Sequence, residues 1–519
     1  MKTRILSSAI LLALLLSSCS GTGNPPVTTS DGTSGDTSTE AETTVLGDNV
    51  PVLDFGGAEF RTIEQSSTKY SFYSAEATGD IISDTIYERN SKIEERFNVT
   101  FAPTISEWYT DISSHVKQSV MAGADDYDLV FGQIFDTSTL AMNGMCLNWN
   151  ILPHMDLTKP WYTANIQKAS IGDKLFMIES DLSTSYTDQT WMIVYNQTKA
   201  EQYQNFPDLY ALVREGKWTI DRMSELIADK YQDLNGDAER NEGDFFGMIA
   251  NQDGCQLAAF VYGSDVRLAA IEDDMTVSNP IGEEKSINAI MKLHDLFNVN
   301  PGSVSKMTDK KIKTEFTTAK KFFVDGSVLF APVQVSTLMS EEFRSFEDHY
   351  GVLPIPKYDE AQKDYHTVVD GGANIMVVPA SAPTDSYELI GAITESLSAA
   401  SYLDLTPVYC GIALEQKGTR DDDSIEILRM ILDSRVIDFA YLYDGFKGWV
   451  MSLPVIIKNE TAITSTIRSK MNAMDSYYNS VIEVLRSEET YMSVFAVRKR
   501  SLFFSEKSDL LIDNTAAVW

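Results

Sequence analysis

The sequence is poor in cations, histidine and cysteine, and it has no long apolar run. Its 519 residues carry 42 Lys and Arg against 75 Asp and Glu, a formal net charge of −33. That imbalance excludes a nucleic-acid binder, because Lys and Arg supply the affinity for a phosphate backbone, and it disfavours a basic patch on anionic lipid. The apolar run at Ile5–Leu16 is shorter than the roughly 20 residues that span a bilayer. The chain is therefore not a multi-pass membrane protein.

Motifs of the common enzyme classes are missing as well. There is no Gly-x-Ser-x-Gly elbow, no His-Glu-x-x-His zinc motif and no Gly-x-x-x-x-Gly-Lys-Ser/Thr phosphate loop. No two of the histidines stand at metal-ligand spacing; they are His115, His154, His294, His349 and His366. We expect no enzyme and no required cofactor. A glycosidase stays an alternative, because it needs only two carboxylates about 5–9 Å apart.

The amino terminus has the layout of a secretory signal. Lys2 and Arg4 precede the apolar run, and Leu16-Ser17-Ser18-Cys19 follows it. This tetrad resembles the bacterial lipobox, whose Cys receives diacylglycerol and acyl chains such as palmitate. We expect a signal peptide at residues 1–18, a lipidated Cys19, and a place on the extracytoplasmic face of the cell membrane. An ordinary signal peptide with a chance Cys is the alternative.

Residues 19–49 are predicted to be a disordered tether. From Ser20 to Thr44 the chain has no aromatic residue and consists almost wholly of small and polar residues, so it cannot bury enough apolar surface to become ordered. The folded body is expected to begin near residues 50–55. Its three cysteines are Cys146, Cys255 and Cys410. An odd number cannot all pair, and we expect three buried thiols.

Short apolar segments alternate with amphipathic helices through the body, the pattern of an α/β fold. Ile82, Ile86, Ile93 and Phe97 line one face of a predicted helix. Thr219 is placed to cap another helix, because its hydroxyl can accept a free amide N–H. Strands are predicted at 60–63, 99–101, 128–131, 191–195, 328–330, 350–353 and 375–378, and further helices from about 384 and 424.

Several short motifs occur in the order found in one family of binding proteins. They are Tyr127-Asp128-Leu129-Val130, Pro160-Trp161-Tyr162, Gly172-Asp173-Lys174-Leu175, Val194-Tyr195-Asn196, Gly216-Lys217-Trp218-Thr219, and Leu353-Pro354-Ile355-Pro356-Lys357-Tyr358. With the lipobox and the tether before them, they resemble the extracellular solute-binding proteins of family 1, the capture subunits of ATP-binding-cassette (ABC) sugar importers. The resemblance runs from Cys19 to about Tyr478.

This resemblance implies an α/β, two-lobed periplasmic-binding-protein-like fold with an interlobe cleft for the ligand. It places lobe one at residues 50–190 with 327–378, and lobe two at residues 195–325 with 380–519. Hinge crossovers between the lobes are expected near residues 189–195, 327–333 and 376–379. Closure about such a hinge is the usual motion of these proteins.

Sugars present apolar ring faces and hydroxyls, so their sites combine aromatic platforms with amides and carboxylates. By the resemblance, ligand contacts lie in the loop after the third strand, and Gln189 stands where relatives carry a Glu. Their stacking Trp falls near Val333 and Gln334, which disfavours a maltodextrin. The candidate ligand-binding residues are Gln133, Phe135, Asp136, Tyr186, Asp188, Gln189, Trp191, Gln334, Asp370, Asn374 and Trp449.

Each candidate has a structural alternative. Trp161, a further stacking candidate, belongs to a motif of the whole family and is expected to be structural. For Trp191, a place in the hinge core and a place in the ligand cleft are equally favoured. The glycines between Asp370 and Asn374 either let the backbone approach a ligand or form a turn.

A separate acidic segment has the spacing of an EF-hand calcium loop. Ala238 replaces the turn glycine of that loop, and Asp244 replaces its bidentate Glu. A structural calcium site and a solvated acidic turn are the two interpretations. The candidate metal ligands are Asp233, Asn235, Asp237, Glu239, Asn241 and Asp244.

Together these features predict a monomeric, lipid-anchored receptor that captures a carbohydrate, expected to be an oligosaccharide, and presents it to ABC permease subunits. It would bind its ligand without transforming it. The rival hypotheses are the same scaffold for a non-sugar solute such as a peptide, a surface glycan hydrolase, and an adhesin or sensor that does not transport.

Overall fold

The computed structural model describes residues 47–65, 72–163, 166–305, 309, 312 and 318–487. The predicted signal peptide, Cys19 and all but the end of the predicted tether lie outside the described residues. The described residues belong to one compact unit that begins at Gly47. None of the helices in these ranges is long and apolar enough to cross a membrane.

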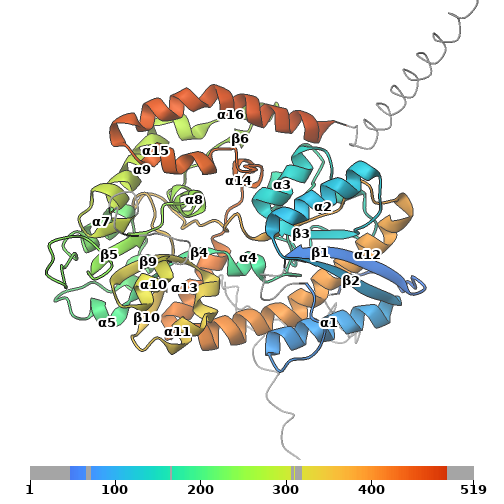
Figure 1. Ribbon diagram of the computed structural model, residues 1–519, viewed down its shortest axis with the longest axis horizontal. Coiled ribbons are helices and arrows are strands. Elements are labelled where there is room, and N and C mark those ends of the chain that lie inside the picture. The colour runs from blue at the N-terminus through green and yellow to red at the C-terminus, as the bar shows by residue number, and fades with distance from the viewer. Residues whose placement is uncertain are drawn as a thin grey trace, which may run out of the picture. The chain divides into compact units, whose positions relative to one another are not determined.

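A four-stranded sheet forms from the first part of the body and one later strand. Its elements are β1 (Ala58–Gln65), β2 (Val99–Ser106), β3 (Leu129–Gln133) and β11 (Asn374–Val377), with α1 (Ile81–Phe97), α2 (Tyr109–Ala122), α3 (Ile134–Met142) and α12 (Tyr387–Ala400). The strand order is β11-β3-β1-β2, and only β11 is antiparallel to its neighbour. Helices α1 and α2 cover opposite faces of this sheet, and α12 packs on α1 (Figure 1).

A five-stranded sheet forms from the middle of the chain. Its elements are β4 (Trp191–Asn196), β5 (Phe246–Ala250), β8 (Ser303–Ser305), β9 (Val328–Gln334) and β10 (Tyr350–Leu353), with α7 (Ile220–Ile227), α8 (Gly254–Gly263), α9 (Glu284–His294), α10 (Thr318–Val324), α11 (Glu341–Ser345) and α13 (Asp422–Asp433). The strand order is β10-β4-β9-β5-β8. Every residue of β4, β5 and β9 is buried, because helices cover both faces of the sheet.

The predicted Thr219 cap forms, and a second cap that was not predicted, Asp80, begins α1. Asp80 accepts from the amides of Ile82 and Ser83 at the start of α1, and the Thr219 hydroxyl accepts from the Arg222 amide at 3.2 Å at the start of α7. These side chains satisfy amides that have no partner inside the helix.

Three chain passes run side by side where the two sheets meet. Trp191 N donates to Val368 O at 3.1 Å, and Asp370 N donates to Gln189 O at 2.8 Å. The third pass is attached to the second by Val436 N, which donates to Thr367 O at 2.8 Å. The first pass lies where the first crossover was predicted.

The strand pairing corrects part of the predicted division into lobes. β9 and β10 both pair with β4, so residues 328–353 lie in the five-stranded sheet and not with the first lobe. The chain returns to the first sheet only at β11, so residues 327–333 form no crossover. α12 packs on α1, which places residues 387–400 with the first sheet as well.

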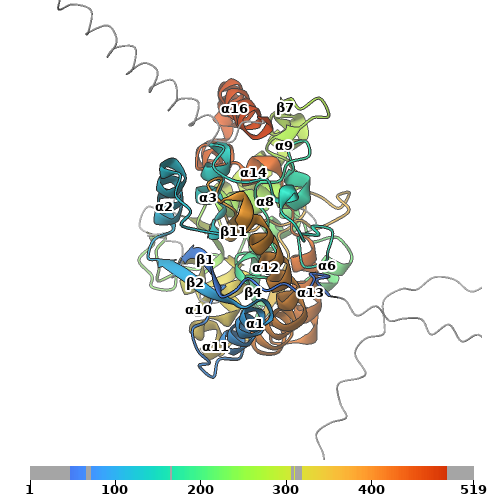
Figure 2. The ribbon, with the colours of Figure 1, turned by 90° about the vertical axis from the view of Figure 1, so that its right-hand side faces the viewer.

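The last helices connect both parts of the unit. They are α14 (Phe439–Leu442), α15 (Leu453–Ile457) and α16 (Ile463–Arg486). α16 packs on α3 beside the first sheet and on α9 beside the second, at the top of Figures 1 and 2. Its buried face carries residues such as Ile467, Met474 and Tyr478 at helical spacing.

Candidate functional site

A row of polar side chains follows the ends of the strands in the four-stranded sheet. We call this row, made of Gln65, Ser106, Trp108, Gln133 and Asn374, the first edge. Gln65 pairs with Ser106, and Asn374 pairs with Gln133. The Gln133 amide donates to the Gln65 side-chain oxygen at 3.3 Å. The first edge therefore presents several amides along one line, at the strand ends where α/β sheets bind ligands.

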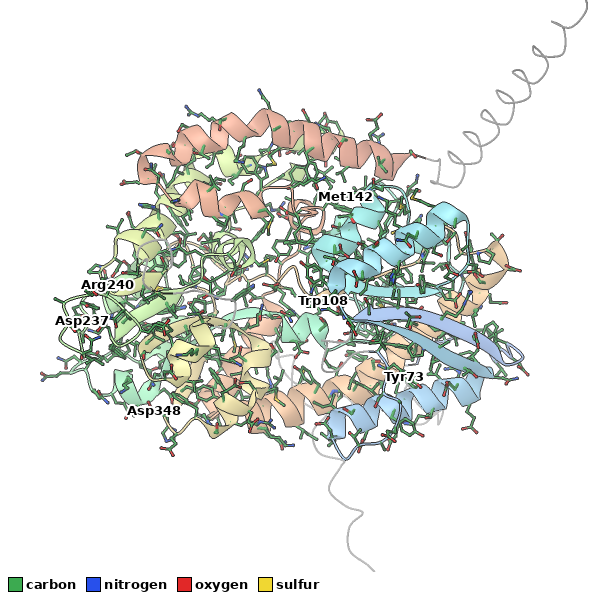
Figure 3. The ribbon with its side chains drawn as sticks, viewed as in Figure 1. Tyr73, Trp108, Met142, Asp237, Arg240 and Asp348 are labelled. Carbon is green, nitrogen blue, oxygen red and sulfur yellow. The ribbon has the colours of Figure 1, made fainter. Side chains whose placement is uncertain are left out.

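Trp108 ends this row and is the most exposed aromatic residue of the described chain, at 66%. It follows β2 and occupies the position before α2, where its side chain makes no capping hydrogen bond. Figure 3 shows it at the centre of the view, on the side of the first sheet that faces the second. Sequence reasoning missed it, although an aromatic residue where a polar cap is favoured is a usable signal.

The matching ends of the five-stranded sheet form the second edge, made of Trp191, Gln334 and Asn251. Trp191 pairs with Gln334 across β4 and β9, and both are buried. A cavity of about 240 Å³ opens beside them, with Lys320 and the hydroxyls of Ser336, Thr337 and Ser340 in its wall. No described residue accepts a hydrogen bond from the Trp191 indole Nε1.

The segment from Asp370 to Asn374 joins the two edges, because Asp370 lies beside Gln334 and Asn374 pairs with Gln133. The Asp370 carboxylate accepts from the Gly372 amide at 2.8 Å, and the side chains of Gln334 and Cys255 lie beside it. Burial raises the pKa of Asp370 to about 6. We call the two edges and this connecting segment the strand-end site.

The segment forms the predicted turn, in which Ala373 N donates to Asp370 O at 2.9 Å, and Gly371 in this turn also lies against a ring. A Cβ there would lie 2.5 Å from the ring of Phe135, a distance that no side chain can adopt. Its hydrogen is needed so that the backbone can lie against Phe135. The close approach is therefore to an aromatic ring of the protein.

Phe135 and Asp136, predicted in a loop after the third strand, lie instead in the first turn of α3 and pack inward. Phe135 is buried, with its ring centroid 5.1 Å from that of Tyr441 and 5.7 Å from that of Phe446. Asp136 accepts from the Ser113 hydroxyl at 2.8 Å, and burial raises its pKa. These two residues support the first edge from beneath, and their predicted ligand contacts stay untested.

Three further candidates belong to the first chain pass and to α4 (Ser185–Asp188). Tyr186 is buried, and the guanidinium of Arg435 lies 5.0 Å from its ring centroid. Asp188 accepts from the Thr184 hydroxyl at 2.9 Å and from the hydroxyl of Tyr409. Because Gln189 binds Asp370 through its backbone, this group braces the passes beside the strand-end site.

The tryptophans divide by burial. Trp449 is fully buried, and its indole Nε1 donates to Asn279 Oδ1 at 2.6 Å. The predicted stacking role of Trp449 is therefore wrong, because the core encloses the side chain and leaves no ring face for a ligand. Trp161 is also buried, in agreement with the structural role expected for it.

The predicted calcium loop closes on itself through side-chain hydrogen bonds. Asp233 accepts from the amides of Gly236 at 2.7 Å and Ala238 at 2.9 Å. Asp244 is buried and accepts from the Asn241 amide at 3.1 Å. Among the described residues, no group of three or more His, Cys, Asp or Glu side chains is arranged to hold a metal ion. Calcium binding by the six candidate ligands, two of which are Asn, stays a prediction.

The three cysteines in the described ranges are free thiols. Cys146 is buried as expected, whereas Cys255 and Cys410 are only partly buried. Burial raises the pKa of all three thiols, which makes them weak nucleophiles at neutral pH.

No protein-family model matches the chain, and no curated protein matches it. A solved cyclo/maltodextrin-binding protein complexed with maltotetraose is similar, with a TM-score of 0.50 and 11% identity over 86% of this chain and 98% of that chain. Maltose-bound MalE3 of T. maritima is similar with a TM-score of 0.49 and 11% identity, over 82% of this chain and 99% of that chain. The maltotriose-bound MalE domain of Bdellovibrio bacteriovorus is similar with a TM-score of 0.47 and 14% identity, over 86% of this chain and 100% of that chain. At 11% identity the likeness to the cyclo/maltodextrin-binding protein shows the fold alone, and the predicted two-lobed α/β binding-protein fold is confirmed.

Proposed function

We propose that this protein is an extracytoplasmic solute-binding lipoprotein that captures an oligosaccharide at the strand-end site and delivers it to an ABC permease. The observation that carries the proposal is the exposed indole of Trp108 at the end of a row of amides. A flat aromatic face beside amide donors and acceptors suits a sugar, which has an apolar ring face and hydroxyls around it. The fold of a protein solved with maltotetraose supports the same ligand class.

Binding without catalysis follows from this mechanism. Trp108 stacks on one ring, the amides of Gln65 and Gln133 bind hydroxyls, and the cavity beside Trp191 takes polar groups from the second sheet. Bending at the three chain passes brings the edges together around the ligand. The ligand favours the closed state only by its greater affinity for that state.

A thermal-shift screen of the purified protein against linear oligosaccharides, monosaccharides and short peptides tests this proposal, because a bound ligand raises the melting temperature by mass action. We expect oligosaccharides to raise it and Trp108→Ala to weaken their affinity about tenfold, the loss of roughly 1.4 kcal/mol of stacking. Tyr87→Ala removes another exposed aromatic residue, on α1, and is the matched control. A shift with peptides alone would reject the sugar, and cleavage of the oligosaccharide would favour a hydrolase.

The anchor and the membrane location rest on Cys19 and need their own test. We expect the protein in the membrane fraction and a lipid-modified amino-terminal peptide in its mass spectrum. Cys19→Ser should release the protein from the membrane without changing sugar affinity. Retention of the variant in the membrane would reject lipidation at this residue.

A further inference from the structure

A second, larger cavity lies at the far end of α8 from the strand-end site. It measures about 580 Å³ and is lined by residues of the stretches 168–172, 262–275 and 436–439 together with His366. We call it the α8 pocket. α8 begins at Gly254 next to the second edge and ends at Gly263, so its ten residues separate the two sites by on the order of 15 Å.

The carboxylate of Asp438, a partly buried residue, lies in the wall of the α8 pocket. Its Oδ1 atom accepts from the Tyr262 hydroxyl at 2.5 Å and from the Tyr441 amide at 2.9 Å. Its Oδ2 atom is buried, and no described residue donates to it. A buried carboxylate oxygen without a donor is costly, so this atom fits a ligand that brings an N–H group.

Two cations also line the α8 pocket and are exposed at its mouth. Among the described residues, neither Lys168 nor Arg267 forms a hydrogen bond or a close ion pair, but Arg267 acts electrostatically on Asp438 and on His366. Of the outer carboxylates that line the pocket, Asp265 pairs with Lys285 at 2.9 Å and Glu272 accepts from the Ser278 hydroxyl, whereas Asp273 is exposed. The pocket therefore combines an inner acceptor with cations and one exposed carboxylate in its outer wall.

The wall also carries an apolar group of side chains. It includes Val266, Ile271, Met275, Ile437 and Phe439. A cavity of this volume with a few convergent polar groups matches the usual site of a small molecule. An apolar group of the ligand would gain from burial against these side chains.

We propose that the α8 pocket binds an apolar α-amino acid in its zwitterionic form. The ligand ammonium donates to Asp438 Oδ2, the ligand carboxylate pairs with Arg267 and Lys168, and the ligand side chain lies on the apolar wall. An anion alone would meet Asp438 and a cation alone would meet Arg267, whereas a zwitterion satisfies both. The proposal is independent of the sugar ligand of the strand-end site.

Isothermal titration of the full protein with leucine, leucine methyl ester and N-acetylleucine tests this assignment. We expect leucine to bind, and both derivatives, each lacking one of the two charges, to bind at least tenfold more weakly. Arg267→Gln changes an exposed residue and should weaken leucine at least tenfold. Asp438→Asn keeps an oxygen that can accept from Tyr262 and Tyr441, and it should also weaken leucine binding at least tenfold.

The controls separate the two sites. Arg222→Gln, which alters a half-buried Arg on α7 that pairs with Glu225, and Trp108→Ala at the first edge should leave leucine affinity unchanged. Absence of binding by leucine, methionine and phenylalanine would overturn the proposal, as would equal binding of the methyl ester. Unchanged affinity in Arg267→Gln would overturn it even if Asp438→Asn does not fold.

Discussion

The two edges of the strand-end site place a tryptophan in opposite surroundings. Trp108 at the first edge is 66% exposed, whereas Trp191 at the second edge is 2% exposed and lies in the wall of a cavity. Both stand at strand ends that face the other sheet. The comparison teaches that residue type and place along a strand are not enough to assign a stacking role, because burial decides whether a ring face can reach a ligand.

The largest expected effect separates the two tryptophans by stability. Trp191→Ala should lower the free energy of unfolding by about 3–5 kcal/mol, since it empties a packed site. Trp108→Ala should change it by less than about 0.5 kcal/mol, as usual for an exposed side chain. Chemical denaturation of both variants measures this, and equal losses would break the comparison.

The segment between the edges gives the next effect. Gly371→Ala should lower the free energy of unfolding by about 1–3 kcal/mol, because the new Cβ overlaps the Phe135 ring. Oligosaccharide affinity should fall with it, since the first edge rests on Phe135. Gly411→Ala, with no atom within 4 Å of the new Cβ, serves as the control, and a similar loss there would contradict the explanation.

The carboxyl of Asp370 should make the junction of the edges sensitive to pH. Its pKa is raised from 3.8 to about 6 by burial, so the folded state binds more protons than the unfolded state between these values. Stability from this group is present at low pH and is lost as the pH rises from about 4 to about 6. Asp370→Asn should reduce the fall in unfolding free energy over that window by on the order of 1 kcal/mol.

Denaturation at pH 4.5 and 6.5 measures that difference. Asp126→Asn replaces an exposed carboxyl near the first sheet and should keep the pH dependence of the unaltered protein. An unchanged fall in the Asp370 variant would show that other buried carboxyls, such as Asp438 and Asp444, account for it.

The smallest expected effect concerns the acidic loop, which has no counterpart near the first edge. We expect calcium to raise the melting temperature slightly by binding the folded state, and Asp233→Ala to abolish that shift. Asp274→Ala removes an aspartate that accepts from the Thr276 amide at 3.0 Å outside the loop, and should leave it intact. A calcium shift that survives in Asp233→Ala would reject the loop as the site.

All four strands of the first sheet, along with β4, β9 and β10, could be predicted because each is a short apolar run. β5 and β8 could not, since β5 contains Gly247 and β8 has three residues. The sheet that receives β9 and β10 was predicted wrongly. An apolar run shows that a strand is buried, but the partners of a strand lie far away in the chain, so local sequence does not specify them.

Among the candidate site residues, placement along the chain was a better guide than exposure. Gln133 and Asn374 lie together because strand ends of one sheet share an edge, and Gln334 of the other sheet lies beside Asp370 in the segment that joins the two edges. Trp449 entered the core and Trp108 was overlooked. Solvent exposure depends on which helices cover a position, and that is set by packing between distant elements.

The sequence by itself determined the acidic character of the chain, its alternating α/β elements, the helix caps and the ends of most strands, since these depend on composition and on neighbours within a few residues. Only the tertiary structure decided how the strands divide between two sheets, which tryptophan faces solvent, and which distant segments line the α8 pocket. These features depend on contacts between segments far apart in the chain, and close packing selects among arrangements that local sequence leaves equivalent.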